Sequence, residues 1–96
     1  MIVLDGPSHP GRVLKDHYLD PLNMSAGALA TRTELSVALL VHLVKGETGM
    51  TAEIAVRLAR FFSTAPEYWM NLQRNYDLHE ARRRVDVTRI EPLKGA

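Results

Sequence analysis

The order of apolar and polar residues along the chain predicts five helices. Apolar side chains recur every three or four residues, the spacing that keeps them on one face of an α-helix. The segments with this pattern are residues 8–21, 25–31, 36–45, 51–62 and 64–83. The pattern is clearest in the fourth, at Ile54, Ala55, Leu58, Ala59 and Phe62. We therefore expect an all-α, five-helix domain.

Small polar residues and prolines mark the predicted helix ends. A hydroxyl just before a helix can accept a hydrogen bond from the first turn. Four such residues precede predicted helices: Ser8, Ser25, Ser36 and Thr51. Residues 64–67, read as Thr-Ala-Pro-Glu, have the form of a capping box at the fifth helix. Pro21 is expected to end the first helix, because the residue before a proline is pushed out of helical geometry.

The same pattern predicts the core and two short strands. In the second, third and fifth predicted helices, the side chains expected to face the core of the domain are Ala28, Leu29, Ala30, Leu40, Leu43, Val44, Trp69 and Tyr76. Residues 2–4 are apolar and residues 85–90 alternate between apolar and polar, which is typical of strands. An isolated strand is unstable, so either tract would have to pair with the other or with a second copy.

Composition limits the possible functions. Ninety-six residues make one small domain, and the net charge of +1 gives no global attraction to nucleic acid. The absence of cysteine excludes disulfides and thiolate chemistry. No signal segment or long apolar run is present, and neither the histidines nor the serines have the spacing of a metal site or a catalytic triad. We expect a soluble, cytoplasmic protein that is not an enzyme and has no cofactor, no metal, no membrane association and no small-molecule substrate.

Residues 25–45 are predicted to form two short helices joined by a tight turn at residues 32–34. Such a pair can place its second helix in the major groove of DNA. The candidate DNA-contacting residues are Ser25, Arg32, Ser36, Val37, Ala38, Val41, His42, Lys45 and Thr48. The apolar members could contact thymine methyl groups, and the polar members could contact phosphates or base edges. Alternatively, the apolar members could pack under a neighbouring element, face solvent or form a protein contact, and the polar members could simply be solvated.

The two halves of the domain are predicted to have different roles. Residues 8–62 form the DNA-binding core, and residues 63–96 hold the last helix and a tail expected to mediate dimerisation. The candidate dimer residues are Tyr68, Leu72, Tyr76, Leu78, Val85, Val87 and Ile90. The arginines at 82–84 are most simply a solvated helix end, although they could also contact phosphates or an acidic partner.

Several motifs in a fixed order resemble those of one known family. They are His-Pro-Gly at 9–11, Asp-Pro-Leu at 20–22, Gly-Met-Thr at 49–51, Ala-Val-Arg-Leu-Ala at 55–59, Ala-Pro-Glu-Tyr-Trp-Met-Asn-Leu-Gln at 65–73 and Asn-Tyr-Asp-Leu at 75–78. Over almost its whole length the chain resembles the HigA/VapI-type antitoxins of the lambda-repressor-like (XRE) helix-turn-helix group. The resemblance implies a homodimeric repressor that binds a palindromic operator at its own promoter. It also implies a toxin partner, a HigB/RelE-like mRNA endonuclease.

The departures from the family pattern fall where DNA would be read. Ala26 replaces a usual glutamine, and Glu34 occupies a turn position that is often glycine. Val37, Ala38 and Val41 stand where polar or basic residues are common. Two alternatives therefore stay open: a stand-alone helix-turn-helix regulator without a toxin, and a protein-interaction module that has lost its affinity for DNA.

Overall fold

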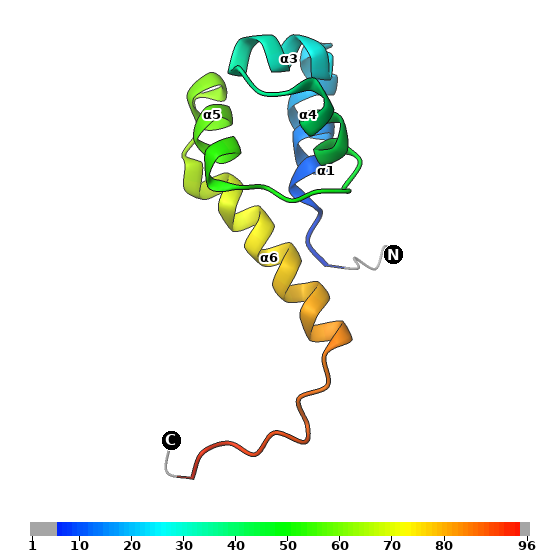
Figure 1. The fold of residues 1–96 in the computed structure, drawn as a ribbon, viewed down its shortest axis with the longest axis vertical. Helices are drawn as coiled ribbons and strands as arrows, with labels where there is room; N and C mark the ends of the chain where they lie inside the picture. Colours follow the sequence, from blue (N-terminus) through cyan, green and yellow to red (C-terminus); the bar gives the residue numbers. More distant parts are fainter. Residues whose placement is uncertain (1–5, 95–96) are drawn as a thin grey trace.

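The computed structural model describes residues 6–94, which form five helices and no β-strand (Figure 1). The first helix consists of α1 (Pro10–Leu14), a π-helical segment η1 (Lys15–Leu19) and α2 (Asp20–Leu22), which follow one another without a break. The others are α3 (Ala26–Thr33), α4 (Val37–Val44), α5 (Ala52–Phe62) and α6 (Pro66–Arg84). The expectation of an all-α, five-helix domain is confirmed.

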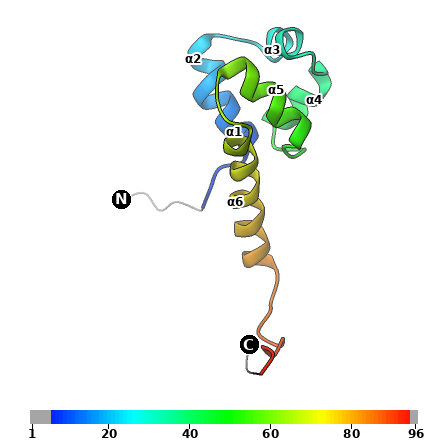
Figure 2. The same cartoon turned by 90° about the vertical axis from the view of Figure 1, so that its left-hand side faces the viewer.

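The helices are arranged as a compact head from which α6 projects (Figures 1 and 2). We call residues 9–69 the body, residues 70–84 of α6 the stem and residues 85–94 the tail. The longest dimension of the molecule is 53 Å, because the stem carries the tail away from the body. Among the described residues, no helix is long and apolar enough to cross a membrane.

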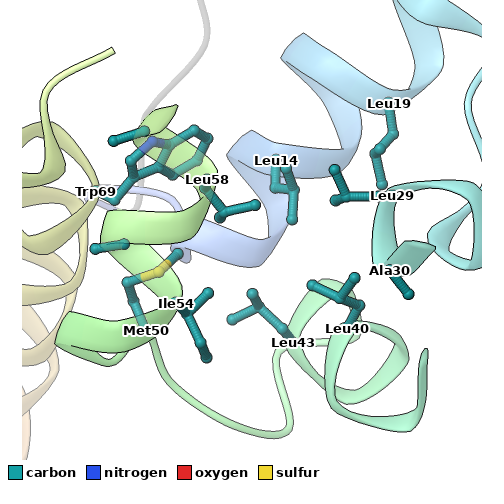
Figure 3. Packing of buried hydrophobic residues seen from close by; sticks show 12 residues of the cluster. Leu14, Leu19, Leu29, Ala30, Leu40, Leu43, Met50, Ile54, Leu58 and Trp69 are labelled. Carbon is teal, nitrogen blue, oxygen red and sulfur yellow. The ribbon is translucent and has the colours of Figure 1, made fainter. Parts of the chain in front are cut away.

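The body encloses a core of leucines and one tryptophan (Figure 3). Its largest fully buried side chains belong to Trp69, Leu14, Leu29, Leu40, Leu43, Leu58 and Pro10. Ile54, Ala55 and Ala59 of the expected α5 face are buried with them. The predicted core is largely confirmed, but Ala28 is exposed, and Val44 and Tyr76 are only half-buried at its edge.

The first helix begins one residue later than Ser8 would place it. His9 is the cap, and its Nδ1 accepts a hydrogen bond from the Gly11 N–H at 2.9 Å. The His9 ring also lies edge-on to Tyr76, with ring centres 5.0 Å apart, so a contact with α6 holds it in the capping position. The prediction that Ser8 caps this helix was therefore wrong.

Pro21 does not end the first helix. Asp20 keeps helical angles (φ −62°, ψ −48°), and the helix ends at Asn23 in the left-handed conformation (φ 51°). The preceding π turn explains the difference, since the Asp20 N–H bonds to the Lys15 carbonyl five residues back. A proline ring normally collides with the carbonyl four residues before it, and the wider π turn relieves this crowding.

The helix pair α3–α4 follows the predicted caps. Ser25 Oγ accepts from the Ala28 N–H at 3.0 Å, and Ser36 Oγ accepts from the Leu39 N–H at 3.2 Å. The turn is shorter than expected, because α3 continues to Thr33 and only then reaches Glu34. Glu34 has φ 59°, in the left-handed region that glycine adopts more easily than any other residue. A glutamate here therefore bears backbone strain.

The cap of α6 is not the predicted capping box. Ala65 occupies the cap position without a side-chain hydrogen bond, and Pro66 begins the helix. The Thr64 hydroxyl instead accepts the indole N–H of buried Trp69 at 2.9 Å. Burying an indole N–H without an acceptor is costly, so this hydroxyl serves the core rather than the helix end.

The alternating run at residues 85–90 is not a strand. The Asp86 carboxylate accepts from the Thr88 N–H at 2.9 Å and from its hydroxyl at 2.7 Å, which forms a local turn. The Val87 carbonyl then accepts from the Ile90 N–H at 3.0 Å. Without a partner strand, the side-chain turn satisfies the backbone better than an extended conformation does. The other predicted strand, residues 2–4, lies outside the described residues.

Candidate nucleic-acid interface

The helix α4 presents an apolar surface at its N-terminal end. Leu40 and Leu43 on its inner side are fully buried and anchor it to the core. On the opposite side Val37 is 50% exposed, Ala38 is exposed and Val41 is half-buried. The start of α4 can therefore approach another surface closely, but it offers methyl groups there instead of hydrogen-bonding groups.

The capping serines keep a hydrogen-bonding function. The side-chain oxygens of Ser25 and Ser36 accept bonds from their own helices, and both residues are exposed. A hydroxyl that accepts one bond still has its own proton to donate. Each serine can therefore donate to a phosphate oxygen while it caps its helix.

A hydrogen-bonded pair lies at the C-terminal end of α4. His42 Nδ1 and Glu47 Oε1 are 2.7 Å apart, and both side chains are more than half exposed. The hydrogen bond from His42, helped by the nearby charge of Lys45, lowers the pKa of the Glu47 carboxyl. Glu47 thus remains negative near the candidate surface, where it would repel the phosphates of DNA.

Two of the predicted contacts lie apart from the outward face of α4. The Arg32 guanidinium lies 5.0 Å from the centre of the Phe61 ring, in the cavity between α3 and α5. Thr48 is half-buried and lines a smaller cavity with His9 and Gln73. The structure therefore brings together Ser36, Val37, Ala38, Val41, His42 and Lys45 on α4, with Ser25 at the start of α3.

The sequence did not indicate a role for Arg57, whose side chain bonds to the turn between α3 and α4. Its Nη1 donates to the Thr33 carbonyl at 3.2 Å and lies 3.6 Å from a Glu34 oxygen. Its Nε bonds to Glu53 at 3.1 Å. The four-residue spacing of Glu53 and Arg57 predicts a pair on one helix, but nothing in the sequence indicates the link to Thr33.

Sequence reasoning also missed Gln73, which joins the stem to the loop after α4. Its side-chain oxygen accepts the backbone N–H of Met50, and its amide nitrogen donates to Asp77 at 2.9 Å. Gly49 fits against the same glutamine, because a Cβ at this position would lie 3.1 Å from its side-chain oxygen. The loop that leaves the candidate DNA helix is thereby held by α6.

The candidate dimer residues fall into two groups. Leu72 and Tyr76 are half-buried against their own body, so they are only partly available to a partner. Tyr68 and Leu78 on α6, together with the tail residues, are between 38% and 69% exposed: Val85, Val87 and Ile90 complete this set. Tyr68 lies in the body, with its ring centre 5.0 Å from that of Trp69, whereas the other exposed residues lie along the stem and the tail.

The described residues contain no group of three or more histidine, aspartate or glutamate side chains that could hold a metal ion. Their charged side chains instead form surface ion pairs, such as Arg12 with Asp16 at 2.8 Å and Lys15 with Asp20 at 2.9 Å. Two exposed features are left as candidates for function: the outward face of α4, and the exposed apolar side chains of the stem and tail.

Comparison with known proteins places this arrangement among helix-turn-helix proteins. No family model matches the chain. Virulence-associated protein I of Dichelobacter nodosus is 39% identical over 86 residues, covering 88% of this chain and 80% of that protein. The structure of the Pseudomonas aeruginosa protein PA4674 in complex with its operator DNA has a TM-score of 0.85 and 37% identity, covering 91% of this chain and 97% of that one.

A second solved structure is the Pseudomonas aeruginosa antitoxin HigA with the higBA promoter. It has a TM-score of 0.81 and 35% identity to this chain, and the match covers 91% of this chain and 98% of that one. The likeness therefore includes both the body and the stem, and extends beyond the helix pair alone.

Proposed function

Because the chain belongs to the HigA/VapI-type antitoxins of the lambda-repressor-like helix-turn-helix group, we propose that it is a DNA-binding antitoxin that represses its own promoter. The observation that carries this proposal is the outward, capped N-terminal end of α4, in a fold that matches an operator-bound protein at TM-score 0.85. Residues 8–62 supply the DNA contacts, and residues 63–96 supply the dimer contacts.

The mechanism follows from the geometry of the helix pair. In a homodimer, two copies of α4 enter successive major grooves of a palindromic operator, about 34–36 Å apart. Ser25, Ser36 and Lys45 contact phosphates and set the position of the protein on the duplex. Val37, Ala38 and Val41 lie against thymine methyl groups, so the operator half-sites are T-rich at these positions.

Repression by occupancy requires no covalent chemistry, so the protein is not an enzyme and acts in the cytoplasm, where its operator lies. As an antitoxin it also binds a HigB/RelE-like endonuclease and covers or distorts its active site. This toxin partner is the part of the proposal that distinguishes the protein from a stand-alone regulator. Co-purification with the product of the neighbouring gene tests it directly.

One observation favours a rival function. The apolar face of α4, next to the acidic Glu47, is also suited to a protein contact, as in an interaction module that no longer binds DNA. A gel shift on the protein's own promoter at increasing salt separates the two. We expect a specific shift whose affinity falls steeply with salt, with a log–log slope near −0.9 per phosphate contacted. No shift at low salt would eliminate the repressor.

The variant Lys45→Ala sharpens the same assay. If Lys45 contacts a phosphate, its removal lowers affinity equally on all sequences and reduces the magnitude of the salt slope by about one. Lys15→Ala is the matched control, because Lys15 lies on η1 and is already paired with Asp20 at 2.9 Å. An unchanged slope in Lys45→Ala removes this residue from the interface.

A further inference from the structure

We infer that the tail of one protomer docks in a groove along α5 of a second copy of the chain. The inference rests on the proposed homodimer and specifies which surfaces form it. The groove and the tail are both open in the single chain, and each has an apolar side chain beside a charge opposite to that of the other.

The groove follows the outward face of α5. A cavity of about 850 Å³ lies between the end of α3 and α5, and a second one of about 400 Å³ lies between α5 and the start of α6. Val56 and Arg60 line both cavities, so the two are neighbours along α5, with Glu34 lining the first and Pro66 the second. Val56 is 56% exposed in the groove, and the half-buried Phe61 forms part of its wall.

A basic and an apolar side chain lie one turn apart along the groove. Arg60 lies near the C-terminal end of α5, and Val56 lies four positions earlier. Four residues of helix correspond to about 6 Å. Nearer the start of α5 the acidic group is already paired, because Glu53 bonds to Arg57 at 3.1 Å. A ligand that lies along this face therefore meets a basic group at Arg60 and then an apolar side chain at Val56.

The tail has an acidic and an apolar side chain at the matching spacing. Glu91 and Leu93 are two residues apart, so in an extended chain they lie on the same side and about 7 Å from each other. Ile90 and Leu93 are the most exposed large apolar residues in the described chain, at 69% and 82%. A tail that runs antiparallel to α5 places Glu91 at Arg60 and Leu93 at Val56.

The occupant is the tail of a second copy, because the stem directs a protomer's own tail away from α5 (Figures 1 and 2). If the two stems of a dimer lie antiparallel, the C-terminal end of one protomer's α6 comes beside Pro66 of its partner, where the partner's groove begins. The tail of the first protomer can then continue along α5 of its partner. Two-fold symmetry forms the contact twice, which suits a closed homodimer.

Cross-linking between single-cysteine chains tests this directly, because the protein has no cysteine of its own. One chain carries Val56→Cys and the other Leu93→Cys, and the two are mixed, allowed to exchange and oxidised. A disulfide forms only when the two Cα atoms come within about 7 Å. We expect a covalent heterodimer on a non-reducing gel. The control replaces Val56→Cys by Leu22→Cys, which is equally exposed at 57% but lies on α2, and should give no such product.

Sedimentation analysis supplies the second measurement. Val56→Ser and Leu93→Ser should each weaken dimerisation about ten-fold, and the double variant should be weaker by less than the product of the two effects, because the residues share one contact. Leu22→Ser should leave the dimer constant unchanged. Independent, multiplicative effects of Val56→Ser and Leu93→Ser would contradict the contact.

The outcomes separate this inference from the proposed function. If the mixture of Val56→Cys and Leu93→Cys forms no heterodimer while the wild-type chain is dimeric and shifts its operator, the tail docking is wrong and the repressor stands. A chain carrying both Val56→Cys and Leu93→Cys that forms only an intrachain disulfide would also overturn the inference. A wild-type chain that is monomeric at every concentration would remove the dimer and the docking together.

Discussion

The body differs from the arm, our name for the stem and tail together (residues 70–94), in how far its large apolar side chains are exposed. In the body, residues such as Leu14, Leu40 and Trp69 are fully buried, and the described chain leaves no buried side-chain polar atom without a partner. Along the arm, Leu78, Val85, Val87, Ile90 and Leu93 are between 43% and 82% exposed. The body buries a core within one chain, whereas the large apolar side chains of the arm are mostly exposed.

The boundary between the two regions lies within α6. Trp69, near its start, packs against the rings of Tyr18 and Phe62, with ring centres 5.1 and 6.2 Å away. Leu78, two and a half turns later on the same helix, is 43% exposed. One continuous helix thus serves as a core element at one end and as an open surface at the other.

The largest expected effect tests this boundary. Trp69→Ala should lower the free energy of unfolding by about 3–5 kcal/mol, because it removes a fully buried ring and leaves a cavity. Leu78→Ala should lower it by less than about 0.5 kcal/mol when the chain is denatured at a concentration that keeps it monomeric. Urea denaturation followed by circular dichroism measures both. Similar losses in the two variants would show that the stem belongs to the body.

A second prediction concerns the packing inside the body. A Cβ at Gly11 would lie 1.7 Å from the Leu43 carbonyl oxygen, so α1 and α4 touch through their backbones. Gly11→Ala should destabilise the fold by about 3 kcal/mol, since backbone must move apart. A Cβ at Gly27 would meet only Ser25 Oγ, at 3.8 Å, so Gly27→Ala should stabilise α3 by about 1 kcal/mol. Thermal denaturation of both variants should show shifts of opposite sign.

A smaller effect is expected at the joint between the two regions. Gln73→Ala removes the acceptor of the Met50 N–H and should lower stability by about 1 kcal/mol. Hydrogen exchange of the Met50 amide should become faster, while amides in α3 change only with global stability. Arg74→Ala, at the exposed neighbouring position, serves as the control. Unchanged Met50 exchange in Gln73→Ala would mean that the stem does not hold this loop.

The smallest effect is a pH dependence at the surface of the body. The hydrogen bond from His42 lowers the pKa of the Glu47 carboxyl, so the pair contributes stability above the ordinary glutamate pKa. This contribution is lost as the pH falls through the lowered value. Carboxyl NMR titration should show Glu47 returning to its ordinary range in His42→Ala. A Glu47 titration that does not change in this variant would mean that the pair does not form in solution.

Local sequence patterns predicted the parts of the fold that depend on neighbours along the chain. The caps Ser25, Ser36 and Thr51 each accept the expected hydrogen bond, because that bond joins residues three apart. The apolar face of α5 is buried as its spacing indicates. The helix pair therefore could be recognised before its surroundings were known.

The errors have two sources, tertiary contacts that compete for a local group and local bonds that replace the expected element. His9 displaced Ser8 as a cap while in contact with Tyr76, which is 67 positions away in the sequence. Thr64 bonds to the buried Trp69 indole instead of a helix N–H. The alternation of residues 85–90 predicted a strand, but a strand needs a partner. The Asp86 carboxylate instead accepts a hydrogen bond from the Thr88 N–H and forms a turn. At the candidate interface, the DNA contact of Arg32 stays a prediction, and nothing in the sequence indicates its contact with Phe61, which depends on tertiary packing.

The length of α6 has a mechanical consequence for a dimer built on it. The stem, residues 70–84 of α6, is about 22 Å long. A tilt of about 10° where it leaves the body would move its far end by roughly 4 Å, about one base-pair step. In the proposed homodimer, the angle between stem and body, held by the bond of Gln73 to the loop, would therefore set the separation of the two α4 helices. The operator spacing of such a dimer would depend on the stem as much as on the helices that touch the bases.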